Sequence, residues 1–163
     1  LVVASGLTDQ IVIDTKDALL VTDVNSEQKL TAIVEKLETT HNQETIDHRK
    51  VRRPWGTYDS VDIGETHQVK RICVNPGARL SRQSHTHRDE HWIVVKGEAE
   101  VYKDGEISIL SENESIFLPK GCIHSLGNSG NEILEIIEVQ YGSYLGEDDI
   151  VRYADLYGRV TEE

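Results

Sequence analysis

The chain has 163 residues, no methionine and a formal net charge of −12. Such a negative charge repels phosphate backbones, so we expect no nucleic-acid partner. The apolar runs are too short for a membrane span, and the first residues lack the basic and apolar stretches of a signal peptide. Two cysteines, Cys73 and Cys122, form no CxxC pair, which suits a reducing cytoplasm. The missing methionine indicates a chain trimmed or cut from a longer one.

The first 40 residues predict a β-hairpin followed by one helix. Two β-prone runs, residues 10–14 and 18–22, flank a short turn. Apolar residues at helical spacing come next, namely Leu30, Ile33, Val34 and Leu37. A hairpin and one helix bury too little surface to fold alone. We therefore expect residues 1–40 to be the end of a larger upstream domain or a flap packed on the rest of the chain, and residues 41–52, which are polar, to be a linker.

From residue 53 onward, β-prone runs alternate with turn sequences. The clearest runs are residues 68–74, 91–95, 98–102, 107–110, 115–118 and 132–141. Asp104-Gly105 lies between two of them and is a strong signal for a tight hairpin. Short strands at this spacing predict an all-β sandwich or barrel over residues 53–159. Near the end, residues 148–157 predict a short helix.

Four side chains form a candidate metal-binding set. Gln83 and His85 are two residues apart, so on a strand they face the same side. Glu90 lies beyond a turn, and His124 belongs to a separate strand. A lone histidine is more often a surface or core residue, but an amide, two imidazoles and a carboxylate together make a mixed nitrogen and oxygen ligand set. Such a set suits a divalent cation, with Zn²⁺ favoured and Mn²⁺, Co²⁺, Ni²⁺ or Fe²⁺ also possible.

The spacing of these residues resembles the two motifs of the cupin jelly-roll barrel. The first motif is matched by Gly77, Gln83, His85, Glu90 and Gly97, with glutamine in place of the usual first histidine. The second is matched by Asn113, Pro119, Gly121, His124 and Asn128, with asparagine in place of the usual glycine. The resemblance implies a closed barrel with the ligands on its inner face.

Longer segments narrow the resemblance to the type II mannose-6-phosphate isomerase domain. They are Arg53-Pro54-Trp55-Gly56, residues 80–95, Glu138-Val139-Gln140 and residues 144–152. That domain is the C-terminal part of bifunctional enzymes that also carry a mannose-1-phosphate guanylyltransferase domain. The resemblance therefore implies that residues 53–159 are a cupin isomerase domain and that residues 1–40 are the end of a nucleotidyltransferase domain. The parent enzyme would contribute to GDP-mannose biosynthesis.

The implied activity is the metal-dependent interconversion of mannose-6-phosphate and fructose-6-phosphate. A phosphate group requires nearby cations, and residues 67–88 contain five basic side chains and no acidic one. Arg88, Lys120 and Arg152 are the candidates for binding the substrate phosphate. Arg88 and Lys120 are also candidates for a part in catalysis.

The group that moves the proton is less well defined by the sequence. His91 and Glu138 are the candidates that we assign to catalysis, and His87 or a metal-bound hydroxide could take the same part. Strand parity alone leaves the facing of the two histidines open.

Three other functions are compatible with these residues. The domain could be a non-catalytic module that senses a sugar phosphate or mediates dimerisation. It could be an iron-dependent oxygenase, although Gln83 disfavours this because an amide replaces an imidazole that would tune the iron. It could also be a piece of an enzyme known for guanylyl transfer, yet no Gly-rich phosphate loop is present, so the fragment alone should lack that activity. We expect a homodimer, as is common among cupins of this family.

Overall fold

The structure is a computed structural model that describes residues 2–16, 18–40 and 48–154. The chain divides into two compact units, Leu1–Arg49 and Lys50–Glu163, and each is described by itself. Within the described residues, no helix has the length and apolar character needed to cross a membrane.

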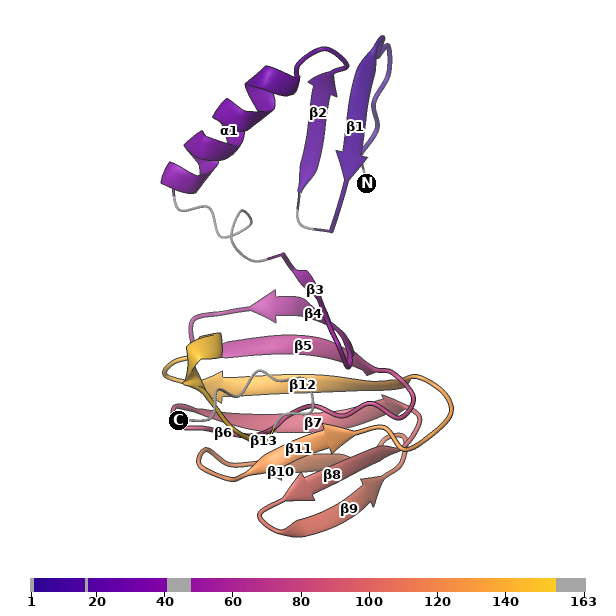
Figure 1. Ribbon diagram of the computed structural model, residues 1–163, viewed down its shortest axis with the longest axis vertical. Coiled ribbons are helices and arrows are strands. Elements are labelled where there is room, and N and C mark those ends of the chain that lie inside the picture. The colour runs from indigo at the N-terminus through magenta and orange to yellow at the C-terminus, as the bar shows by residue number, and fades with distance from the viewer. Residues whose placement is uncertain (1, 17, 41–47, 155–163) are drawn as a thin grey trace. The chain divides into compact units, whose positions relative to one another are not determined.

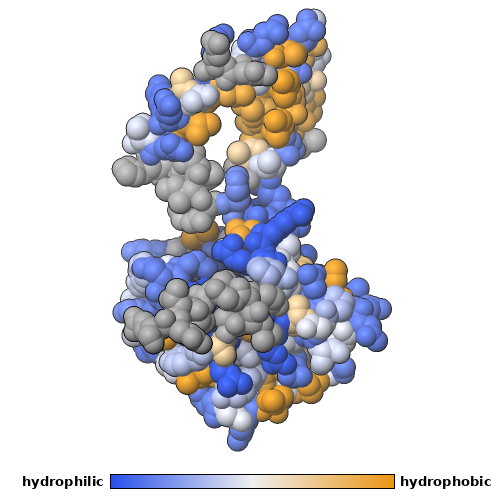
Figure 2. All heavy atoms as spheres, viewed as in Figure 1, coloured by the Kyte–Doolittle hydropathy of each residue, from blue (hydrophilic) through white to orange (hydrophobic). Residues whose placement is uncertain are grey.

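The first unit is the hairpin and helix that the sequence predicts. Strands β1 (Gln10–Asp14) and β2 (Leu19–Asp23) pair in antiparallel fashion, and helix α1 (Glu27–Thr39) comes after them. Apolar side chains on all three elements remain exposed, including Ile13 at 51% and Val34 at 47%. Figure 2 shows the resulting hydrophobic surface over the hairpin. So much apolar surface on so small a unit is typical of a face that packs against further protein.

The second unit is built from two antiparallel β-sheets, as the sequence predicts (Figure 1). The six-stranded sheet has the order β10-β7-β12-β5-β4-β3, and its strands are β3 (Lys50–Arg53), β4 (Gly56–Ile63), β5 (His67–Val74), β7 (Arg88–Lys96), β10 (Ser115–Leu118) and β12 (Leu134–Gly142). The five-stranded sheet has the order β13-β6-β11-β8-β9, and its strands are β6 (Arg82–His85), β8 (Ala99–Lys103), β9 (Glu106–Leu110), β11 (His124–Gly127) and β13 (Ile150–Ala154).

The two sheets enclose one apolar core. Its largest fully buried member is Trp92, and residues from both sheets complete it, among them Ile72, Val94, Val101, Leu126, Leu134 and Ile136. The predicted hairpin at Asp104-Gly105 joins β8 to β9, and both residues have positive φ angles, 47° and 103°. Two successive residues of positive φ are typical of the two-residue type I′ hairpin turn.

Two segments differ from the sequence prediction. Residues 50–52, expected in the linker, belong to β3, which pairs with β4. Residues 150–154, expected in a helix, form β13, which pairs with β6, and a short 3-10 turn, η2 (Glu147–Asp149), precedes it. Both are edge strands whose side chains are mostly exposed, so few buried apolar side chains mark them in the sequence, and their backbone groups pair with a sheet edge.

Three neighbouring strands, β5, β7 and β12, change character along their length. At one end their inward side chains are apolar, and these are Ile72, Val74, Trp92, Val94, Leu134 and Ile136. At the other end the inward side chains are polar, and these are Lys70, Arg88, Glu90, Glu138 and Gln140. Because the strands are paired side by side, the polar ends meet in one place. This end of the barrel holds the candidate site.

Asn128, a predicted motif residue, provides a stability test of the fold. Its side chain is buried, its Nδ2 donates to Val74 O at 2.9 Å and to Glu132 O at 2.7 Å, and its Oδ1 accepts from Gly130 N at 3.0 Å. We expect Asn128→Ala to lower the free energy of unfolding by about 2–3 kcal/mol, because three backbone groups lose their partner and one of them, the Val74 carbonyl, is buried. Urea denaturation measures this. The exposed neighbour Asn131→Ala serves as control, and equal stability of the two variants would contradict the prediction.

Candidate metal centre and adjoining pocket

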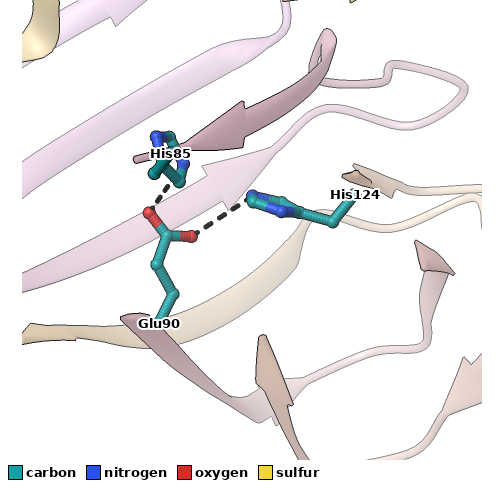
Figure 3. A group of neighbouring side chains, drawn as sticks. All are labelled: His85, Glu90 and His124. Atoms are coloured by element: carbon teal, nitrogen blue, oxygen red, sulfur yellow. Dashed lines mark ion pairs between the residues drawn. The ribbon is translucent and has the colours of Figure 1, made fainter. Parts of the chain in front are cut away.

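Three of the four predicted ligands converge inside the barrel. His85 ends β6, Glu90 lies on β7 and His124 begins β11, and no side chain among them is more than 2% exposed. Their ligand atoms all lie within 4.8 Å of one another. Figure 3 shows the Glu90 carboxylate between the two imidazoles, 3.1 Å from His85 Nε2 and 3.5 Å from His124 Nε2. We call these three residues the metal centre.

The ring nitrogens of this centre fit a bound cation. Both nitrogens of His85 and Nε2 of His124 are buried without a hydrogen-bond partner, although the two Nε2 atoms lie within ion-pair distance of Glu90. Buried polar atoms are rarely left unpaired in native proteins. The other ring nitrogen of His124, Nδ1, lies 3.1 Å from Cys122 O, a contact that directs Nε2 towards the centre. Metal-binding histidines commonly fix their second nitrogen in this way.

Gln83, the fourth predicted ligand, lies beside the centre. It is two residues before His85 on β6 and directly opposite His124 in the β6–β11 pairing. Its Oε1 accepts a hydrogen bond from Ser81 Oγ at 3.1 Å, and its side chain lines the adjoining pocket. Its place next to the centre is therefore established, while its ligation of a cation stays a prediction.

The charges of the metal centre are strongly coupled. Burial alone raises the pKa of Glu90, but contacts with His124 and His85 outweigh it and hold the pKa well below its usual range. Burial alone lowers the pKa of His124, but its contacts with Cys122 and with the Glu90 carboxylate raise the pKa to about 10. Without a metal, His124 thus carries a proton where a cation would bind. A divalent cation and this proton compete for one position.

A solvent-open pocket with about 490 Å³ of empty space adjoins the centre. Four cationic side chains among the described residues line it, namely Arg53, Lys70, Arg88 and Arg152. Three carboxyl groups also line it, those of Glu90, Glu138 and Glu147. Its walls are completed by aromatic and amide side chains, including Trp55, Tyr58, Gln83 and Gln140. Such a lining suits a polar, anionic small molecule.

Arg88 connects the metal centre to the pocket. Its side chain is buried, its Nε donates to Glu90 Oε1 at 3.3 Å, and its Nη1 donates to Gly146 O at 2.9 Å. Arg152 lies on β13 opposite Gln83 and also lines the pocket. Its Nε is buried without a hydrogen-bond partner. The structure therefore places two of the three predicted phosphate-binding residues at the pocket.

Glu138, a predicted catalytic residue, is joined to the metal centre by two shared donors. Trp92 Nε1 donates to Glu90 Oε2 at 3.1 Å and to Glu138 Oε2 at 2.9 Å. Gln140 Nε2 donates to Glu90 Oε1 at 3.2 Å and to Glu138 Oε1 at 2.7 Å. Burial, together with the smaller effect of repulsion from Glu90, raises the pKa of Glu138 to about 8, against the opposing effect of Lys70. A carboxyl that titrates near neutral pH is suited to proton transfer.

Three predicted candidates do not line the pocket. His91 is exposed on the outer face of β7, where its ring lies 4.6 Å from that of Phe117. Lys120 is exposed as well, and its backbone nitrogen donates to Asp89 Oδ1. His87 is 54% exposed and pairs with Asp149. For His91 the reason is strand parity, because its neighbours Glu90 and Trp92 both face inward.

Four residues of the site were not singled out as site residues from the sequence. They are Arg53, Lys70, Gln140 and Glu147. Gln140 has the same parity as Glu138 on one strand, so the alternation could have indicated it. Lys70 belongs to the basic stretch of residues 67–88, but nothing local separates it from Arg71, which faces outward.

Comparison with known proteins gives the family. The model of the family described as "Mannose-6-phosphate isomerase C-terminal" matches residues 40–155. The chain belongs to this family. It is 55% identical over 159 residues to the mannose-1-phosphate guanylyltransferase of Salmonella montevideo, covering 98% of this chain and 34% of the relative. It is 51% identical over 162 residues to the alginate biosynthesis protein AlgA of Pseudomonas aeruginosa, covering 99% of this chain and 34% of the relative.

The chain thus spans about a third of the length of these curated relatives. Among solved structures, the Cnp3 cupin domain of Schizosaccharomyces pombe matches with a TM-score of 0.50 and 16% identity, covering 53% of this chain and 60% of that chain. This likeness concerns the fold alone, and it confirms the predicted cupin barrel.

Replacement of a histidine tests the metal centre. We expect His124→Ala and His85→Ala to lose most bound divalent metal, because each removes one of few ligands from a buried site. Elemental analysis of the purified, folded proteins measures the metal content. His67→Ala is the matched control, since His67 is exposed and pairs with Asp62 at the surface. Full metal occupancy in both test variants would show that the cation, if any, binds elsewhere.

The raised pKa of Glu138 makes the stability of the metal-free protein depend on pH. Between its ordinary value of 4.5 and about 8, the folded protein holds a proton that the unfolded chain releases. Folding then takes up a proton, so the free energy of unfolding falls as pH rises, by about 1.4 kcal/mol per pH unit from this group. Glu138→Gln should flatten that slope in urea denaturation between pH 5 and 8.

Glu135→Gln provides the control for this measurement. Glu135 lies on the same strand but is paired with Arg71 at the surface. It should leave the slope unchanged. A Glu138→Gln variant with the slope of the unmodified protein would mean that Glu138 is ionised when folded.

Proposed function

We propose that this chain interconverts mannose-6-phosphate and fructose-6-phosphate with the help of a divalent cation at the metal centre. Family membership supports the substrate, and one structural observation supports the chemistry. A buried set of two imidazoles and a carboxylate lies at the wall of a pocket lined by four cationic side chains. The first feature suits a metal-assisted reaction and the second a phosphorylated substrate.

The proposed reaction is an isomerisation in which nothing is gained or lost. The proton on C2 of the aldose moves to C1, and the hydroxyl proton on O2 moves to O1, through an enediol. A bound divalent cation supplies Lewis-acid polarisation of the substrate oxygens. The protein must bind the phosphate, orient the reacting carbons and move one proton.

We assign these tasks to residues that line the pocket. Arg88 and Arg152 bind the phosphate, because a guanidinium can donate two hydrogen bonds to it. Glu138 moves the proton, since it lies beside the centre and its pKa of about 8 allows both forms near neutral pH. His91 and Lys120, which face away or lie outside the pocket lining, receive no part in this proposal.

The metal, the parent enzyme and the assembly are also proposals. Zn²⁺ suits the ligand set best, with Mn²⁺, Co²⁺, Ni²⁺ and Fe²⁺ as alternatives. The names of the relatives support a bifunctional GDP-mannose-producing parent that carries a guanylyltransferase domain. The exposed apolar faces of β1, β2 and α1 support the packing of that guanylyltransferase domain against residues 1–40. Two free cysteines support a cytoplasmic location, and the homodimer remains an expectation that light scattering can test.

A coupled assay tests the proposed function directly. The purified protein, stripped of metal and reloaded with each candidate cation, is given fructose-6-phosphate, and mannose-6-phosphate is measured. Turnover with at least one cation supports the isomerase. A tight sugar-phosphate complex without turnover would mean a sensing module, and oxygen uptake by the iron-loaded protein would mean an oxygenase.

The same assay tests the role of Arg88. We expect Arg88→Ala to raise KM for fructose-6-phosphate roughly 10- to 100-fold, because a charge-assisted hydrogen bond to phosphate is lost. Arg88→Lys should restore part of this loss by keeping the charge. Lys96→Ala is the control, since Lys96 is exposed and pairs with Glu132. Unchanged kinetics for Arg88→Ala would remove Arg88 from the site.

A further inference from the structure

Lys70 is a buried cation at the pocket wall that the proposed isomerisation does not use. Its side chain is 6% exposed, and its Nζ lies 2.7 Å from Glu147 Oε1 and 5.0 Å from the centre of the Tyr58 ring. Burial alone lowers the pKa of Lys70, but the carboxyl groups of Glu138 and Glu147 outweigh it, so the pKa is raised. Lys70 is therefore charged at neutral pH and needs an anion beside it.

Glu147 supplies that anion from the rim of the pocket. It opens the turn η2, and its side chain remains 47% exposed. The turn itself is fixed on both sides. Arg88 Nη1 donates to Gly146 O, and the Asp149 carboxylate accepts from two backbone nitrogens of the turn between β6 and β7, at 3.1 and 3.2 Å. The backbone of this turn is thus held in place. The half-exposed Glu147 carboxylate, by contrast, can leave Lys70 and become hydrated.

Several cations surround this one carboxylate. Burial raises the pKa of Glu147, but Lys70 and then Arg88 and Arg53 lower it below its usual range. The Tyr58 ring lies 5.0 Å from Lys70 Nζ and 5.4 Å from the Arg53 guanidinium carbon, so both cations pack on one aromatic side chain. A phosphate dianion offers more charge and more acceptor oxygens to such a group of cations than a carboxylate does.

Two other atoms of the pocket wall also await a ligand. Gln140 Oε1 and Arg152 Nε are buried and have no hydrogen-bond partner among the described residues. One is an acceptor and the other a donor. A molecule carrying both hydroxyl groups and an anionic group satisfies both.

We propose that Lys70 and Arg53 join Arg88 and Arg152 in the phosphate subsite, and that Glu147 occupies it until the substrate phosphate displaces the carboxylate. The inference rests on the proposed sugar-phosphate substrate. In the empty protein the Lys70–Glu147 pair compensates a buried cation. On binding, the phosphate takes over Lys70, and Glu147 turns to solvent.

This exchange gives the site a means of selection. A neutral hexose has no group that can replace a carboxylate on Lys70, so it must bind beside an occupied subsite. The phosphate of a phosphorylated hexose can replace the Glu147 carboxylate as the ion-pair partner of these cations. The affinity for a phosphorylated substrate therefore depends on how much more strongly its phosphate binds these cations than the Glu147 carboxylate does.

Inorganic phosphate is the probe that tests the subsite apart from turnover. Its dissociation constant is measured by calorimetry on the metal-loaded protein and on Glu147→Gln, which keeps the shape of the side chain and removes its charge. We expect the variant to bind phosphate roughly tenfold more tightly, because the internal competitor is lost. Asp148→Asn, the next residue along, is the matched control for a general change of charge, and it should alter binding less than twofold. Asp148 is exposed and accepts from Tyr144 Oη.

The same comparison in a Lys70→Gln background tests whether Glu147 acts through Lys70. If Glu147 acts through Lys70, then Glu147→Gln tightens phosphate binding much less in that background than in the unmodified protein. The proposal is overturned if Glu147→Gln lowers the dissociation constant of phosphate equally in both backgrounds, or if Asp148→Asn lowers it as much. It is also overturned if Glu147→Gln binds phosphate no more tightly than the unmodified protein. Phosphate bound directly to the metal would show no dependence on Glu147. Because no sugar is converted in this experiment, a protein without isomerase activity can still show the subsite, and an active isomerase can still fail to show it.

Discussion

The burial of the Glu90 carboxylate is the constraint around which the polar end of the barrel is built. An isolated charge at this depth would cost several kcal/mol, so it persists only with partners on every side. Those partners come from four strands, namely His85 on β6, Arg88 and Trp92 on β7, His124 on β11 and Gln140 on β12. Because two sheets contribute, the cluster exists only when the barrel is closed.

The polar side chains of the pocket extend outward from this carboxylate in one connected series. Glu90 faces the histidines on one side, while Trp92 and Gln140 connect it to Glu138 on the other. Beyond Glu138 lie Lys70 and then the half-exposed Glu147. Lys70 compensates the carboxyl groups of Glu138 and Glu147 on either side of it, and of the three carboxyl groups in this series only that of Glu147 has access to solvent. A cation at the centre and an anion at the rim would thus enter a site already arranged for opposite charges at opposite ends.

The two units of the chain differ in how far they bury their apolar side chains. The barrel buries its apolar residues and gathers its chemistry at one end, and its family membership is shown. The hairpin and helix instead expose apolar faces, and the relatives that match them are about three times as long as this chain. A small unit with unburied apolar surface on three elements gains stability from a further packing partner.

The sequence alone determined the local features, because these depend on neighbours along the chain. The strand at residues 91–95, the turn at Asp104-Gly105 and the ligand spacing of His85 and Glu90 could all be read directly. Only the tertiary structure decided which groups share the pocket, since strand register is set by long-range packing. Cross-strand pairing placed Lys70 opposite Glu138 and Arg152 opposite Gln83, and strand parity turned His91 away. Edge strands β3 and β13 escaped prediction because most of their side chains are exposed, while backbone pairing with a neighbouring strand sets their place.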